Sequence, residues 1–192
     1  MMIEILFFSV IAMGILTDLI YKKLDKYKEL IITYSVSVVL ALICSHILPE
    51  IFSIHNKHIG FFLLGGFVLQ ILLELLSKGI EHGHIHQNGK ISKKELAVIF
   101  IGLSIHSFIE GLPVKTYTEF HTHDNNISFS WIYLSAILIH KLPIAVILMI
   151  LLRTLNFNLI KKYIYILIFA ISCPAGSYFG EYLLNFTFFK NW

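Results

Sequence analysis

Apolar residues fall into six long segments that alternate with short polar connections along the chain. The apolar segments run over residues 2–20, 29–49, 59–77, 95–114, 129–152 and 163–185. A helix needs about 20 apolar residues to cross the roughly 30 Å hydrocarbon core of a membrane, and the segments lack the alternation typical of barrel strands. The pattern therefore predicts an all-α, polytopic membrane helix bundle of about six transmembrane helices, with residues 1–192 as one transmembrane domain.

Composition supports a membrane protein, and the basic residues give it an orientation. Hydrophobic residues make up 57% of the 192 residues and charged residues only 14%, against about 25% charged residues in soluble domains. The first, third and fifth connections hold most of the basic residues, namely Lys22, Lys23, Lys26, Lys28, Lys78, Lys90, Lys93, Lys94, Arg153, Lys161 and Lys162. Because Lys and Arg collect on the cytoplasmic side, both termini are expected outside. The lysine-rich inner connections fit a bacterial inner membrane. The N-terminal segment is expected to be a retained span rather than a cleaved signal peptide.

Ionisable residues cluster within the fourth and fifth apolar segments. His106 and Glu110 are four residues apart in IHSFIEGLPV, so they share one face of a helix, and His140 lies near the middle of the next, antiparallel segment. Buried ionisable groups in a membrane are costly and usually functional. Two imidazoles and a carboxylate are suitable ligands for zinc and for other divalent transition metals, and Ser107 would add a weak hydroxyl ligand. A single histidine in a span is more often a hydrogen-bonding partner for a neighbouring helix, so the prediction depends on the combination.

Other polar residues support weaker predictions. Pro143 is expected to free the carbonyl of Ile139 and bend the fifth span beside a cavity, and Pro113 to end the fourth span. Plain helix packing is the alternative for both prolines. His46 and Glu50, near the outer end of the second span, form either a capture site for ions or an interfacial polar cap.

The connection 78–94, expected in the cytoplasm, carries three closely spaced histidines. His82, His84 and His86 occur in EHGHIHQNG, a composition associated with metal binding. The alternative is a solvated loop with no ligand. We interpret the three histidines as a site of loop metal capture because they agree with the predicted site in the membrane.

Several motifs resemble the ZIP (Zrt/Irt-like) family of divalent metal transporters. HSFIEG at 106–111 is similar to its fourth-span signature, HKLPIA at 140–145 to its fifth-span signature and HILPE at 46–50 to the end of its second span. The histidine-bearing connection and SCPAGSYFG at 172–180 fit the same order. The resemblance implies a main metal site of His106, Ser107, Glu110 and His140, movement of metal toward the cytosol, and a homodimer with elevator-like or rocking motion.

The sequence departs from the family pattern in three places. Lys141 and Ile144 stand where the fuller fifth-span motif carries acidic or amide residues, which removes carboxylate from what is otherwise a two-metal site. The Lys141 ammonium is expected to pair with Glu110, leaving one metal per subunit. The milder alternative is that Lys141 only weakens metal binding by repulsion. The family normally has eight spans, whereas six are expected here, which indicates either a short six-span variant or an incomplete product.

The leading hypothesis is a transporter without catalytic activity, which carries zinc as its substrate, with Fe²⁺, Mn²⁺ or Cd²⁺ as other candidate ions. It needs no resident cofactor and no nucleic acid; its partners are the ion, lipid and a second copy of the chain. A membrane protein that binds metal without moving it is one alternative. The other is an intramembrane metal-dependent hydrolase, although the sequence has no HExxH motif.

Overall fold

A computed structural model describes residues 2–53, 58–77, 91–120 and 127–185. Nearly all of these residues are helical, and no strand occurs among them. The elements in chain order are α1 (Met2–Leu42), the π-helix η1 (Ile43–Ile47), α2 (Leu48–Ser53), α3 (Ile59–Ser77), α4 (Lys93–Phe120), α5 (Ile127–Thr154) and α6 (Leu159–Asn185). The prediction of an all-α fold is therefore confirmed for the part of the chain that the structure describes.

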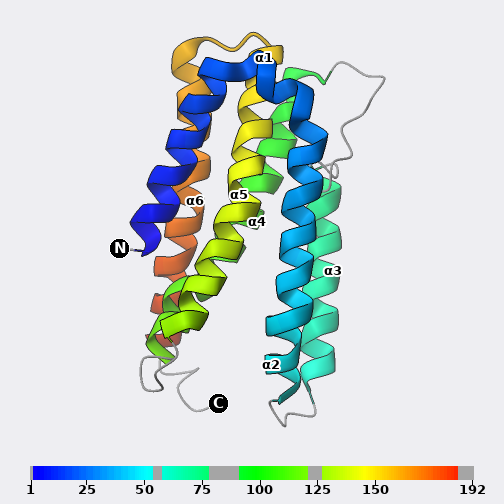
Figure 1. Ribbon diagram of the computed structural model, residues 1–192, viewed down its shortest axis with the longest axis vertical. Coiled ribbons are helices and arrows are strands. Elements are labelled where there is room, and N and C mark those ends of the chain that lie inside the picture. The colour runs from blue at the N-terminus through cyan, green and yellow to red at the C-terminus, as the bar shows by residue number, and fades with distance from the viewer. Residues whose placement is uncertain (1, 54–57, 78–90, 121–126, 186–192) are drawn as a thin grey trace.

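Helix α1 bends and forms two arms that run in opposite directions. The bend begins at Ile20, whose φ of −111° and ψ of 27° are not helical. Figure 1 shows the chain crossing one end of the bundle there, with α5 between the two arms. The prediction of a non-helical connection at 21–28 is wrong, because these residues remain helical. The segment YKKLDKYK contains neither Gly nor Pro, so nothing in it strongly opposes a helix.

Four helical stretches are long and apolar enough to cross a membrane. They are Ile3–Ser53, Lys93–Lys115, Tyr133–Thr154 and Leu159–Leu183, with a shorter apolar helix at Ile59–Leu75. The first stretch has 51 residues and would extend about 75 Å if straight, far beyond one membrane crossing. The bend at Ile20 divides it into two arms that each have the length of one span, while the count of six spans stays a prediction.

The helix bounds agree with most of the predicted spans. Helix α3 coincides with the span expected at 59–77, whereas α4 runs on to Phe120. Pro113 therefore lies inside α4 and does not end the helix, although the stretch that could cross a membrane, Lys93–Lys115, ends close to it as predicted. Proline removes one backbone donor, but membrane helices tolerate it where neighbouring helices compensate.

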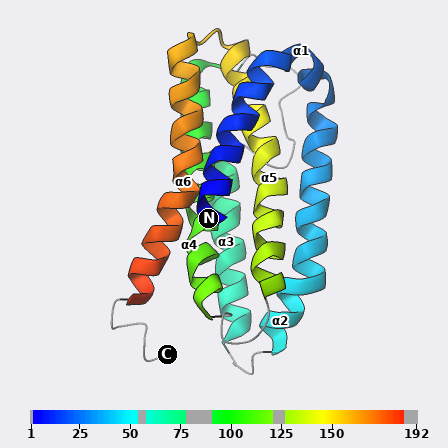
Figure 2. The ribbon, with the colours of Figure 1, turned by 60° about the vertical axis from the view of Figure 1, so that its left-hand side comes forward.

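Helix α5 lies at the centre of the bundle and is the most deeply buried helix (Figure 2). Its second half forms the main apolar core with residues of α1, α4 and α6. Beside it, α4 and α6 approach so closely that a Cβ added at Gly111, Gly176 or Gly180 would meet a backbone carbonyl oxygen of the other helix. This tight pair holds α4, which carries His106 and Glu110.

A polar cluster joins α1 to the ends of α5 and α6. The Asp18 carboxylate lies 2.6 Å from Lys162 Nζ, 3.1 Å from Tyr163 OH and 3.3 Å from Arg153 NH1. Arg153 also donates a hydrogen bond to the backbone carbonyl of Asp18, just before the bend at Ile20. The sequence does not predict this cluster, because its charged residues lie far apart in the chain. It fixes the bend of α1 against the α5–α6 connection.

Replacing Asp18 with Asn is expected to destabilise the protein clearly. The side chains of Asp18 and Lys162 are only 11% and 9% exposed, and removing one partner of a buried pair costs several kcal/mol. We expect a loss of about 2 kcal/mol, which lowers the melting temperature by about 4–8 °C in a chain of this size. Thermal unfolding of the purified protein in detergent measures the change.

The matched control is Asp25→Asn in the same helix. Asp25 pairs with Lys28 at 2.9 Å, but both side chains are much more exposed, and such surface pairs contribute less than about 1 kcal/mol. Equal melting temperatures for the two variants would show that the Asp18 cluster does not stabilise the fold.

Candidate metal site

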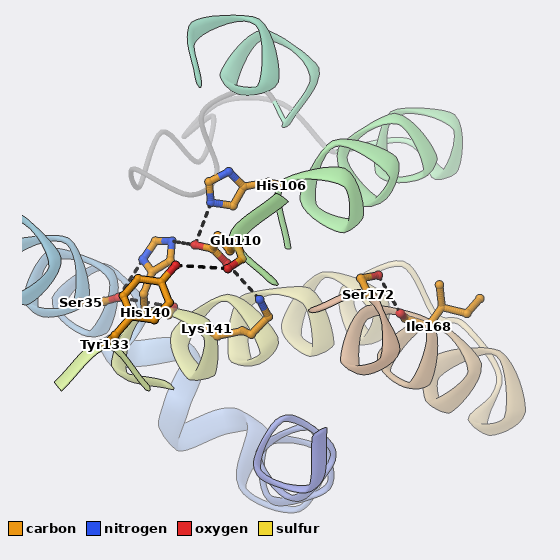
Figure 3. A network of polar contacts seen from close by, with 8 residues as sticks. All are labelled: Ser35, His106, Glu110, Tyr133, His140, Lys141, Ile168 and Ser172. Carbon is orange, nitrogen blue, oxygen red and sulfur yellow. Dashed lines mark hydrogen bonds and ion pairs between the residues drawn. The ribbon is translucent and has the colours of Figure 1, made fainter. Parts of the chain in front are cut away.

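Helices α4 and α5 bring together the three residues that the sequence predicts as metal ligands. His106 and Glu110 project from the same face of α4, and His140 projects from α5 toward them (Figure 3). Glu110 Oε1 lies 3.1 Å from His106 Nε2 and 3.5 Å from His140 Nε2. The carboxylate is therefore the centre of the group, with one imidazole on each side.

The spacing of these atoms suits one divalent ion. One ligand atom from each of the three residues lies within 4.8 Å of the others. Bonds of about 2.0–2.2 Å to nitrogen and oxygen place the ligands of a tetrahedral zinc about 3.4 Å apart. The two distances to Glu110 Oε1, 3.1 and 3.5 Å, are close to this value. Among the described residues, no other group of this kind occurs.

Lys141 occupies the other side of Glu110. Its Nζ lies 3.0 Å from Glu110 Oε2, and its side chain is 1% exposed. The ammonium also lies 5.7 Å from the centre of the Phe169 ring. The expected pairing of Lys141 with Glu110 is thus present in the structure. It divides the carboxylate: Oε2 faces the ammonium, and Oε1 faces the two imidazoles.

The group opens onto a pocket of about 370 Å³. The pocket lies between the second arm of α1, η1, α3, α4 and α5, and its wall is mostly apolar. The lining residues are Val39, Leu42, Ile43, Ile47, Gln70, His106, Glu110, Tyr133, Ala136, Ile137 and His140. Gln70 of α3 thus faces the pocket. The η1 segment of the wall is a π-helix, and π-helices often occur at functional sites.

Two residues near this group were not predicted from the sequence. Tyr133 donates a hydrogen bond of 3.3 Å from its hydroxyl to the backbone carbonyl of Glu110. Ser35 lies in the second arm of α1, with its Oγ 3.4 Å from His140 Nδ1. Both lie in mostly apolar segments near other hydroxyl residues, and nothing in the sequence singles them out as neighbours of His140 or Glu110.

The remaining predicted residues lie away from the three ligands or outside the described parts. Ser107 is buried, and its hydroxyl has no hydrogen-bond partner among the described residues, yet it does not line the pocket. His46 is exposed in η1 and contacts Ser45 at 2.6 Å. Pro143 lines a separate apolar pocket with Met13, and α5 continues as a helix through it. The side chain of Glu50 and the whole of His82, His84 and His86 lie outside the described residues.

Comparisons with known proteins agree with this geometry. The family model described as ZIP zinc transporter matches residues 81–185. The match includes α4, α5 and α6, and therefore all three residues of the metal-ligand group. No curated protein and no solved structure matches the chain. Because the family match covers more than half of a chain whose long apolar helices suit a membrane, the protein belongs to the ZIP zinc transporter family of multi-pass membrane proteins.

Proposed function

We propose that the protein carries zinc toward the cytosol through a single site formed by His106, Glu110 and His140. The observation that carries the proposal is the convergence of two imidazoles and one carboxylate at a pocket between helices. Nitrogen and oxygen ligands of this kind suit zinc and also Fe²⁺, Mn²⁺ and Cd²⁺. Ser107 joins the proposed site only through the family resemblance, since its hydroxyl has no hydrogen-bond partner among the described residues.

The arrangement of basic residues supports a direction for transport. The bend of α1, the start of α4 and the connection between α5 and α6 lie at the same end of the bundle (Figure 1), and these segments hold most of the lysines. Basic segments favour the cytoplasmic side. We therefore place this end in the cytosol and both termini outside, with six spans in a cell membrane, and propose a bacterial inner membrane.

The packing on the two sides of the site supports entry from the outside. From His140 toward the start of α5, the residues Tyr133, Ala136 and Ile137 line the open pocket. From His140 toward the basic end, Ile144–Leu152 are buried in the apolar core. In this conformation the ligands are accessible from the proposed outer side and closed from the cytosol. Release into the cytosol then requires α5 and its neighbours to move relative to one another.

Two further parts of the proposal concern partners. The histidines of the connection 78–94 would bind the ion after release, because they lie on the proposed cytoplasmic side. We also propose a homodimer, as the family resemblance implies, which native mass spectrometry of the protein in detergent would test.

Metal flux in proteoliposomes tests the proposed function. The purified protein should move zinc into vesicles with saturable kinetics, and competition by Fe²⁺, Mn²⁺ and Cd²⁺ ranks the candidate ions. Vesicles that contain His106→Ala protein serve as the control. Zinc binding without flux would instead identify a membrane metal-binding protein that does not transport, and chelator-sensitive hydrolysis would identify an enzyme.

Lys141 is expected to limit the site to one weakly held metal. A dication and an ammonium about 6 Å apart repel by roughly 5 kcal/mol at an effective dielectric constant of 20, although relaxation reduces this value. Lys141→Met should therefore tighten zinc binding at least about tenfold while keeping one ion per chain. Lys141→Glu, which supplies a second carboxylate, should allow two ions per chain.

Calorimetric titration with zinc measures both the affinity and the stoichiometry. Lys115→Met is the matched control. Lys115 lies outside the site and pairs with Glu181, with 2.6 Å between Nζ and Oε2. Wild-type protein that binds two ions, or a Lys141→Met variant with unchanged affinity, would contradict this role for the ammonium.

A further inference from the structure

Ser35 connects the second arm of α1 to one of the proposed metal ligands. Its side chain is buried, with 2% of the residue exposed. The hydroxyl oxygen lies 3.4 Å from His140 Nδ1 and 3.4 Å from the backbone carbonyl oxygen of the same residue (Figure 3). Among helical serines, bonding to the carbonyl four residues earlier is the common alternative, as Ser37 does with Thr33 at 2.8 Å. Ser35 instead turns toward α5.

The two contacts of Ser35 fit one arrangement of hydrogen atoms. Binding of a metal through His140 Nε2 requires a lone pair on that nitrogen, so the ring hydrogen must be on Nδ1. Nδ1–H then donates to Ser35 Oγ, and the Ser35 hydroxyl donates to the His140 carbonyl. Each donor has an acceptor, and the ring is held with Nε2 toward Glu110, where the distance to Oε1 is 3.5 Å.

The surroundings of Ser35 support a role at the site. Val39 and Leu42 follow it by four and seven residues and therefore share its face of the helix, and both line the metal pocket. The face of α1 that forms the pocket wall thus also contacts the ligand from α5. Histidine ligands commonly need such a partner on their second nitrogen, and its removal typically weakens metal binding 10- to 100-fold.

We propose that Ser35 is a positioning residue, whose hydroxyl holds His140 in the orientation and tautomer that bind the metal through Nε2. The proposal rests on the proposed function, because it takes His140 as a ligand of the transported ion. In this proposal α1 is one of the elements that determine metal affinity. Helix α1 lies outside the region matched by the family model.

Zinc dissociation constants of the full-length protein, measured by competition with a chelating dye, test the proposal. We expect Ser35→Ala to bind zinc 10- to 100-fold more weakly and Ser35→Thr, which keeps the hydroxyl, to stay within about threefold of wild type. Ser37→Ala is the matched control and should bind as wild type, since the Ser37 hydroxyl is exposed and bonds within its own helix. Unchanged binding by Ser35→Ala would overturn the proposal.

A second measurement separates positioning from a general structural role. His140→Ala keeps His106 and Glu110 and should bind zinc weakly. If Ser35 acts through His140, adding Ser35→Ala to this variant changes the dissociation constant less than about twofold. The positioning role would be overturned if Ser35→Ala weakened zinc binding as much in the His140→Ala background as in the wild type. It would also be overturned if the weaker binding came with a lowered melting temperature and Ser35→Thr did not restore it. Because these measurements use binding, absence of flux in proteoliposomes would contradict the transport function without affecting them.

Discussion

Replacing Glu110 with Gln should abolish metal uptake. Glu110 is the one carboxylate of the proposed metal site, and its two oxygens contact His106, His140 and Lys141. The glutamine variant has two neutral imidazoles and an ammonium at the site, and therefore no negative charge to attract a dication. Removing one partner of a buried ionic contact costs about 3–5 kcal/mol, so we expect zinc affinity to fall by a factor of roughly 10² or more. Zinc uptake into proteoliposomes measures the loss.

A matched control separates loss of the ligand from loss of the fold. Glu181→Gln removes a carboxylate that pairs with Lys115 outside the site, and this variant should keep its uptake. Glu110→Gln also leaves the buried Lys141 ammonium without its counter-ion, which could reduce stability. The double variant Glu110→Gln, Lys141→Met removes both charges and should regain stability while remaining inactive. Uptake near the wild-type rate by either Glu110 variant would show that the carboxylate is not a ligand.

The meeting of His106, Glu110 and His140 could be predicted because it depends on simple geometry. Residues four apart share a helix face, which places His106 beside Glu110. A short connection makes neighbouring spans antiparallel, which brings the middle of one span to the middle of the next. The pairing of Lys141 with Glu110 followed instead from the family resemblance, which implies a second cation at the place of the ammonium. The structure agrees at each of these positions, within the part of the chain it describes.

Contacts between distant segments could not be predicted in this way. Ser35 and His140 are separated by 105 residues, and a serine in a mostly apolar span, close to Thr33 and Ser37, gives no sign of its partner. The same reason applies to Asp18, whose partners Lys162 and Tyr163 lie at the other end of the chain. Polar composition favoured a loop at 21–28, but helix propensity and packing of both α1 arms on α5 outweighed it.

Gly176→Ala should strongly destabilise the pair of helices that supports the metal site. A Cβ at Gly176 would collide with the backbone carbonyl oxygen of Phe108 in α4, two residues before Glu110. A backbone atom cannot turn aside as a flexible side chain can, so α4 and α6 must separate. Overpacking of this kind costs about 1–3 kcal/mol, and we expect the melting temperature to fall by about 2–12 °C. Zinc affinity should fall with it, because Glu110 moves with α4.

Glycine to alanine at Gly66 should have the opposite effect on the melting temperature. It therefore serves as the control for the close contact between α4 and α6. A Cβ at Gly66 in α3 has no atom within 4 Å, and alanine in a helix is more favourable than glycine by up to about 1 kcal/mol. Gly66→Ala should therefore keep or raise the melting temperature and leave zinc binding unchanged. The two variants differ only in what the added methyl group meets, so any difference between them measures the α4–α6 contact. Equal melting temperatures would mean that α4 and α6 can move apart at little cost, and that their close approach does not hold the ligands of α4 in place.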